Sequence, residues 1–384
     1  MKSRFDPYRL PYAPRPKQKQ AFSHIDKGYN TAVILPTGYG KTNIALYAFQ
    51  DAADHNRKFL MLLPLKALVD EMKEKLGRYF DILPVSGDYR QNKRIIFKTE
   101  TDSYSMTYEM AYQLMISTRN RPRFFKDIEW IVIDEAHLMT DWGRGPQLES
   151  FLYLLQNFCK DARFILLTAT VGNPKEFSIH FGCKLVYAMP EERPVKLIKE
   201  VKPHRHVSQS EEKIELIETL LHETIQNCPR NKKDCPSLLV FCNSRRLTKE
   251  LHESLAKKQR YPWIRTDFHH AGRSKEVRNR VEEKFREGDI NLLFATPTLA
   301  MGVNVPADIV IICGVTRVNP LTWKEEMLEA SEIIQMIGRA GRGGALSKLR
   351  MQETDPNTGK KTGPQLPYGK AIVACEDSDE PKVR

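Results

Sequence analysis

Short apolar segments alternate with amphipathic ones along all 384 residues, and this alternation limits the possible folds more than any other feature. The apolar segments are five to seven residues long and rich in valine, isoleucine, leucine and phenylalanine, which is typical of strands covered on both faces. Strands that alternate with helices form parallel sheets, so the sequence predicts an α/β fold with two similar halves. The predicted strands are residues 31–35, 58–64, 130–134 and 164–168, then 237–241, 291–296, 309–313 and 370–375.

Two stretches interrupt the alternation. Residues 191–212 are rich in proline and charge, and we predict that they link a first domain, residues 1–190, to a second, residues 213–384. Residues 343–369 are strongly polar, which predicts a mobile loop. Residues 95–109 fit one strand or a hairpin equally well.

Composition narrows the cellular setting and the class of partner. A net charge of +12 favours a polyanionic partner. No apolar run reaches the roughly 18 residues that span a membrane, and the first residues lack the apolar stretch of a secretory signal. Seven cysteines without a CxxC pair argue against a zinc site and a disulfide framework. We therefore expect a cytoplasmic or nucleoid-associated protein that is not secreted and has no membrane partner.

The segment ILPTGYGKT, residues 34–42, predicts a phosphate-binding loop. It places a glycine turn between a strand and a helix, where unpaired amides and the helix dipole attract anions. Lys41 would reach the β- and γ-phosphates and the Thr42 hydroxyl would bind Mg²⁺. Leu35 stands where the general pattern has glycine, so a plain glycine turn is the alternative. The predicted nucleotide-binding residues here are Thr37, Gly38, Gly40, Lys41 and Thr42.

Two adjacent carboxylates follow the predicted strand of the segment WIVIDEAH, residues 130–137. Asp134 would bind Mg²⁺, and Glu135 would deprotonate the water that attacks the γ-phosphate. A solvated acidic pair is the alternative, but the preceding phosphate loop favours a nucleoside triphosphatase that uses ATP and Mg²⁺.

The motifs resemble those of the superfamily-two helicases and follow that family's order. The resemblance implies two tandem RecA-like parallel-sheet domains with an ATP cleft between them. The first-domain motifs are RPKQKQA (15–21), TGYGKT (37–42), PLKALVDE (64–71), TYE (107–109), DEAH (134–137) and LTAT (167–170). Those of the second domain are FCNSRR (241–246), FHHAG (268–272), ATPTLAMGVNVPA (295–307) and QMIGRAGRGG (335–344).

The resemblance also implies roles for single residues. Gln18 would read the adenine, Gly302 would contact the nucleotide, and His137 would couple the two domains. Gln335, Arg339 and Arg342 would complete the catalytic site. A guanidinium meets the γ-phosphoryl oxygens bidentately, and we place Arg339 and Arg342 on one helix face. Nucleic acid would be bound by Pro64, Lys66, Thr107, Asn243, Arg245, Thr296 and Trp323.

Two further features lie in the second half. The adjacent histidines His269 and His270 are expected to cap a loop or touch phosphate rather than bind metal. Between the last two motifs, Asn319–Pro320 predicts a turn, and Trp323 or Leu321 would stack on the last base pair of a duplex. The alternative is that Trp323 packs in the core.

Among superfamily-two helicases, residues 134–149 and the last two motifs are most similar to the Ski-like branch, which includes the archaeal fork-processing enzymes. Members of this branch continue into a winged helix and a ratchet domain, so a fragment, a subunit assisted by other proteins and a minimal motor all remain open. The resemblance implies an ATP-dependent 3′–5′ helicase or translocase on single-stranded or tailed duplex nucleic acid, with DNA slightly favoured over RNA. A remodeller or annealer, and a nucleic-acid-binding subunit of a larger complex, are the alternatives.

Overall fold

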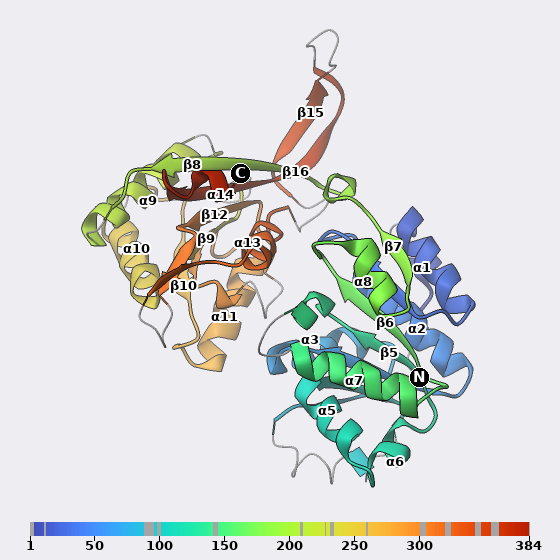
Figure 1. The fold of residues 1–384 in the computed structure, drawn as a ribbon. Coiled ribbons are helices and arrows are strands. Elements are labelled where there is room, and N and C mark those ends of the chain that lie inside the picture. Colours follow the sequence, from blue (N-terminus) through green and yellow to red (C-terminus); the bar gives the residue numbers. More distant parts are fainter. Residues whose placement is uncertain are drawn as a thin grey trace. The chain divides into compact units, whose positions relative to one another are not determined.

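The computed structural model divides the chain into two compact units, Met1–Arg193 and Pro194–Arg384 (Figure 1). The division falls near the start of residues 191–212, which we predicted to be a linker. The structure describes residues 4–10, 13–87, 96–97, 101–140, 145–207, 210–226, 228–230, 234–258, 260–299, 305–318, 324–341, 347–354 and 361–383. No helix within these ranges is long and apolar enough to cross a membrane.

The first unit contains a parallel sheet whose described strands follow the order β3-β4-β2-β5-β6-β1-β7. The four predicted strands correspond to β1, β2, β5 and β6, whereas β3 and β7 were not predicted. Within residues 95–109, β4 is one strand rather than a hairpin with a second strand among the residues described. The strands are β1 (Thr31–Ile34), β2 (Lys58–Leu63), β3 (Ile82–Val85), β4 (Ser103–Thr107), β5 (Ile128–Ile133), β6 (Arg163–Thr168) and β7 (Lys184–Tyr187).

Helices cover both faces of this sheet. Alternate strand residues point to opposite faces, so Phe59 and Met61 join the core under α1, α2 and α3, while Leu60 and Leu62 join the core under α5, α6 and α7. The helices are α1 (Pro16–Asp26), α2 (Lys41–Asp54), α3 (Lys66–Leu76), α5 (Tyr108–Ile116), α6 (Arg121–Phe125), α7 (Gly145–Phe158) and α8 (Pro174–His180), with 3₁₀ turns η1 (Pro7–Arg9), η2 (Ala136–Thr140) and η3 (Pro190–Glu192).

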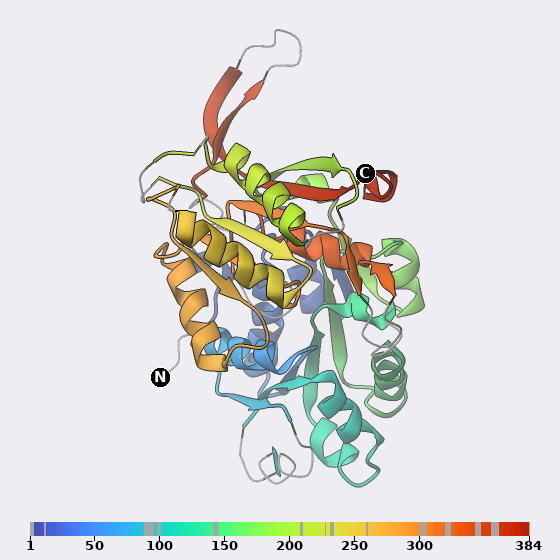
Figure 2. The ribbon, with the colours of Figure 1, turned by 90° about the vertical axis from the view of Figure 1, so that its left-hand side faces the viewer.

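The second unit contains a second sheet, in which β10, β11, β9, β12, β16 and β8 are parallel neighbours in that order. β15 pairs antiparallel with the first part of β16, and β13 pairs separately with β14 (Figure 2). The strands are β8 (Lys196–His204), β9 (Leu238–Cys242), β10 (Thr266–His269), β11 (Leu292–Ala295), β12 (Ile309–Cys313), β13 (Thr316–Val318), β14 (Glu325–Met327), β15 (Arg350–Thr354) and β16 (Lys361–Glu376).

Helices again lie on both faces of this sheet. One core lies between the sheet, α11 and α13, and the other lies between the sheet, α9 and α10. The predicted strands of this half match β9, β11, β12 and the end of β16. The helices are α9 (Ser210–Ile225), α10 (Arg245–Lys258), α11 (Lys275–Arg286), α13 (Ala330–Ile337) and α14 (Glu380–Val383).

Two predicted irregular stretches form strands instead. β8 lies inside the predicted linker and pairs with β16 over nine residues, Lys196 to His204. It is half-exposed and alternates charged with apolar residues, so it lacks the continuous apolar run of a central strand. The predicted mobile loop at 343–369 contains β15 and the first part of β16, whose backbone groups pair with each other despite their polar sequence.

The hairpin of β13 and β14 lies within the interval predicted to hold a wedge. Asn319, Pro320, Leu321 and Trp323, which were predicted to form its turn and to stack on a base pair, lie outside the described residues. The strand pairing is consistent with a turn between Val318 and Glu325, and the role of Trp323 stays a prediction.

Candidate nucleotide and nucleic-acid site

The phosphate loop lies between the end of β1 and the start of α2. Gly38 and Gly40 have φ angles of 84° and 92°, in the left-handed region that favours glycine. A Cβ atom on Gly40 would also lie only 2.6 Å from Nε2 of Gln18. Gly40 is therefore required both by its backbone conformation and by the space around it. No side chain caps the N-terminus of α2, as expected of an anion-binding helix.

Three side chains hold this loop from below. Nζ of Lys41 donates to the carbonyl of Leu35 at 2.8 Å, and Nε2 of Gln18 donates to the carbonyl of Gly40 at 3.1 Å. Nη1 of Arg15 donates to the carbonyl of Tyr39 at 2.8 Å. Gln18 is buried, and its Oε1 accepts from the amide of Arg15, so its amide holds the loop in this structure. The sequence did not indicate the contact of Arg15, although this residue begins the motif RPKQKQA.

Asp134 lies at the carboxyl end of β5. Its amide donates to the carbonyl of Leu62 at 3.0 Å, and its Oδ1 accepts from the amide of Glu135 at 3.0 Å. Burial and the negative charge of Glu135 raise the pKa of Asp134 to about 7, while the positive charge of Lys41 acts in the opposite direction. The phosphate loop and the acidic pair therefore lie within electrostatic range of each other.

Thr42 and Asp134 supply a hydroxyl and a carboxylate, the hard oxygen ligands that Mg²⁺ prefers. Thr42 is the second residue of α2 and is half-buried. A divalent cation would also favour the ionised form of the Asp134 carboxyl, whose pKa is raised without it. The residues present fit the predicted ion.

Glu135 has the chemistry of a general base. Its Oε2 atom is buried and accepts no hydrogen bond among the described residues, and it lies 3.4 Å from Nδ1 of His137. Nδ1 of His137 also lies 3.2 Å from Oγ1 of Thr168, at the end of β6. His137 thus joins the acidic pair to the motif LTAT within the first unit, and its predicted coupling of the two domains stays a prediction.

Tyr108 contributes a contact that the sequence did not indicate. Its side chain is buried, and its hydroxyl donates to the backbone carbonyl of Asp134. Tyr108 directly follows Thr107, so the motif TYE contacts the acidic pair through its second residue.

The predicted nucleic-acid residues of the first unit lie at two helix N-termini. Pro64 follows β2, and the exposed Lys66 begins α3; Thr107 ends β4 and directly precedes α5. No side chain caps either helix. β2 and β4 are parallel neighbours with Leu63 opposite Thr107, so these N-termini begin at the same edge of the sheet.

The second unit gathers its predicted nucleic-acid residues at the carboxyl ends of β9 and β11. Asn243 and Arg245 follow β9 and are exposed, whereas Thr296 follows β11 and is buried, with Oγ1 2.9 Å from Oγ1 of Thr298. Burial and the charge of Arg245 lower the pKa of His270, which places these two residues near each other. Gly302 and Trp323 lie outside the described residues.

The predicted helix face of Arg339 and Arg342 is wrong for Arg339. Gln335 lies on α13, but this helix ends at Ile337 and Gly338 caps it, so Arg339 lies in the following turn. The backbone is held there by hydrogen bonds to Ala307 and by contact with the next strand.

A glycine pair explains that contact. A Cβ atom on Gly369 would lie 2.6 Å from the amide nitrogen of Gly341, and Gly341 has a φ of 66°. The two backbones can approach this closely only without side chains. Arg342 lies outside the described residues.

His269 has a partner that the sequence did not indicate. Its Nε2 lies 2.8 Å from Oε1 of Glu282 on α11, and both side chains are almost fully buried. His270 accepts a hydrogen bond from the amide of Gly272, which agrees with the expected loop cap.

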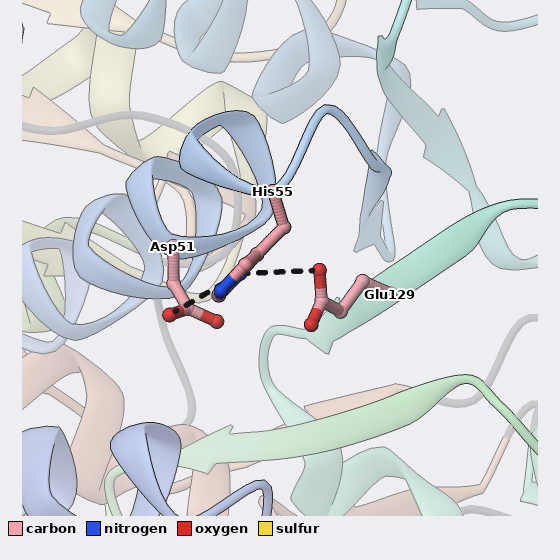
Figure 3. Close-up of side chains that lie close together, drawn as sticks. All are labelled: Asp51, His55 and Glu129. Atoms are coloured by element: carbon pink, nitrogen blue, oxygen red, sulfur yellow. Dashed lines mark ion pairs between the residues drawn. The ribbon is translucent and has the colours of Figure 1, made fainter.

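A second group of possible metal ligands lies at the opposite end of β5. Figure 3 shows Asp51 and His55 of α2 beside Glu129 of β5, and their potential ligand atoms lie within 4.8 Å of one another. Nδ1 of His55 lies 3.8 Å from Oδ1 of Asp51 and 3.7 Å from Oε2 of Glu129. Arg57 and Arg163 also act on Glu129 electrostatically, so positive side chains already balance these carboxylates.

The fold and the site define the class of protein. Residues 15–177 match the model of the DEAD/DEAH box helicase family, and residues 212–344 match the model of the helicase conserved C-terminal domain. The chain carries both domains, with two parallel sheets of RecA-like type, and belongs to the superfamily-two helicases.

Individual relatives narrow the resemblance to archaeal helicases, as predicted. The ATP-dependent DNA helicase Hel308 of Thermoplasma acidophilum is 31% identical over 355 residues, which cover 85% of this chain and 50% of that protein. Hel308 of Pyrococcus abyssi is 30% identical over 367 residues, covering 85% and 48%. A probable ATP-dependent helicase of Methanocaldococcus jannaschii is 32% identical over 385 residues, covering 93% and 44%. The chain spans about half the length of the curated relatives it matches.

Proposed function

We propose that this chain is the motor core of an ATP-dependent helicase that moves 3′ to 5′ along single-stranded DNA. The observation that carries the proposal is the arrangement at one edge of the first sheet. The phosphate loop, the acidic pair and Thr168 follow β1, β5 and β6, which include the neighbouring pairs β5–β6 and β6–β1. Ligands of open parallel sheets bind at these carboxyl ends.

Hydrolysis would use residues in distinct roles. Lys41 and the loop amides bind the β- and γ-phosphates, and Thr42 and Asp134 hold Mg²⁺, which neutralises phosphate charge. Glu135 accepts the proton of the attacking water, for which its buried Oε2 provides an acceptor that no described donor occupies. Arg339 and Arg342 would stabilise charge on the γ-phosphoryl group in the transition state.

DNA would be held through its phosphates. The N-termini of α3 and α5 offer amides that no side chain caps, and Lys66 adds a positive charge to the first of them. Asn243, Arg245 and Thr296 would provide contacts from the second unit. Such contacts bind without reading the base sequence, which suits a motor that moves along any strand. DNA is favoured over RNA because the Hel308 relatives are named DNA helicases.

The test is ATP turnover measured without nucleic acid, with single-stranded DNA and with single-stranded RNA, followed by unwinding of 3′- and 5′-tailed duplexes. We expect DNA to stimulate turnover most and the 3′-tailed duplex to be unwound faster. Absence of stimulation by either nucleic acid would contradict the proposal. Stimulated turnover without strand separation would favour a remodeller, and faster unwinding from a 5′ tail would overturn the direction.

A further inference from the structure

We infer that Tyr108 is a positioning residue for the general base Glu135, and that it connects the DNA-binding segment after β4 to ATP hydrolysis. The inference rests on the proposed function. It starts from the backbone of Glu135, whose φ of 52° lies in the left-handed region. The other described non-glycine residues at positive φ are Asn56 and Asp127, and asparagine and aspartate adopt this conformation more readily than glutamate.

The peptide group between Asp134 and Glu135 is held at both of its polar atoms. Its carbonyl oxygen accepts from the Tyr108 hydroxyl, and its N–H donates to Oδ1 of Asp134 at 3.0 Å. The orientation of this peptide group governs where the Glu135 side chain can point. Oδ1 of Asp134 belongs to a carboxylate that would also bind Mg²⁺, so the Tyr108 hydroxyl is the restraint that no ion or substrate is expected to share.

Tyr108 is itself held in place. It is the first residue of α5, its side chain is almost fully buried, and it packs in the core under α5 and α7. A movement of the β4–α5 junction would therefore move the hydroxyl with it. Thr107, its neighbour in the chain, lies at the helix N-terminus proposed to bind a DNA phosphate. DNA bound at this point would change the position of Glu135 through one side chain.

The test substitution is Tyr108→Phe, which removes the hydroxyl and keeps the ring in the core. Tyr104→Phe is the matched control, because Tyr104 is also buried in β4 and no described residue accepts a hydrogen bond from its hydroxyl. We expect Tyr108→Phe to lower kcat of the DNA-stimulated reaction about tenfold, with KM for ATP and the Kd for single-stranded DNA within about twofold of wild type. Tyr104→Phe should leave all three unchanged.

A second background separates positioning from general damage. If Tyr108 acts through Glu135, then Tyr108→Phe should add little to the loss in a Glu135→Gln protein, measured in single-turnover hydrolysis. Unchanged kcat in Tyr108→Phe would overturn the inference, as would an equal further loss in the Glu135→Gln background. If wild-type turnover does not respond to DNA, the proposed function and the DNA connection fail together. The effect on unstimulated kcat would then still test the positioning of Glu135.

Discussion

The two ends of β5 carry the same kinds of side chain in different surroundings. At the amino end, Glu129 lies beside His55 and Asp51; at the carboxyl end, Glu135 and Asp134 lie beside His137. Each end has a carboxyl group whose pKa is raised by burial and by a neighbouring carboxylate. Residue type alone therefore does not distinguish a catalytic cluster from an ion-pair cluster.

The surroundings make the distinction. Trp130 donates to Oδ2 of Asp51 at 2.8 Å, and Arg57 and Arg163 act on Glu129, so the amino end is balanced by the protein itself. The carboxyl end has a phosphate loop opposite the carboxylates and a base whose outer oxygen has no described donor. A parallel sheet directs its loops and helix N-termini to this end. The lesson is that the end of the strand assigns the chemistry.

The largest expected difference between the two ends is in turnover. Glu135→Gln should lower kcat about 10³-fold because it removes the proton acceptor, while nucleotide binding is kept. Glu129→Gln, the same change at the amino end, should leave kcat within about twofold. Steady-state ATPase assays and a nucleotide-binding titration measure both quantities. Equal losses in the two variants would break the comparison.

A pair of cations gives the next effect. Lys41→Ala should lower turnover about 10²-fold and also weaken nucleotide binding, because an ammonium is lost from the phosphates. Arg57→Ala removes a cation near Glu129 at the other end and should change neither quantity. Fluorescent-nucleotide binding together with ATPase rates tests this. Normal nucleotide affinity in Lys41→Ala would remove this residue from the phosphate site.

At the amino end we expect an effect on stability instead. Trp130→Phe leaves Oδ2 of Asp51 without its donor and should lower the free energy of unfolding by about 2 kcal/mol, with turnover by the folded protein unchanged. Trp263→Phe is the control, since Nε1 of Trp263 is buried without a described partner and the substitution removes no hydrogen bond. Chemical denaturation measures the difference. An equal cost in both variants would assign it to packing alone.

The smallest effect is a pH dependence. The pKa of Glu129 is raised in the folded protein, so its contribution to stability is complete below the unfolded pKa and is lost as the pH rises through the folded value. Glu129→Gln should therefore raise Tm slightly at neutral pH, and this gain should disappear as the pH falls towards 4. Paired melting curves of wild type and variant across that range test the sign. A gain that grows on acidification would contradict the raised pKa.

The central strands and the phosphate loop could be predicted from sequence because their signals are local. An apolar run such as residues 309–313 identifies a buried strand by itself, and the glycines before Lys41 identify the turn. β8 was missed because an edge strand needs only one partner and tolerates charge. The turn at Arg339 follows from Gly338 and from the approach of Gly341 to Gly369, and a helical pattern continued through GRAGR hides it.

The side-chain contacts that organise the site could not be predicted in this way. Gln18 lies 22 residues from the carbonyl that it holds, and Tyr108 lies 26 residues from the carbonyl of Asp134. Each contact depends on the order of strands in the sheet, which places β4 and β5 on either side of β2. No local pattern records that order, although the motifs themselves were placed correctly at the ends of their strands.

The length of β16 has a mechanical consequence. The strand runs for 16 residues, or about 50 Å at 3.3 Å per residue; its last part lies between β12 and β8, and its first part projects with β15 beyond that sheet (Figure 1). One continuous backbone thus forms both the anchored end and the overhanging end of a cantilever. A sideways load on the overhang becomes a torque where the strand enters the sheet, at Tyr368 and Gly369. Gly369 is in contact there with Gly341, two residues after Arg339, so a weak pull far from the sheet would be felt as a twist in the segment that carries this arginine.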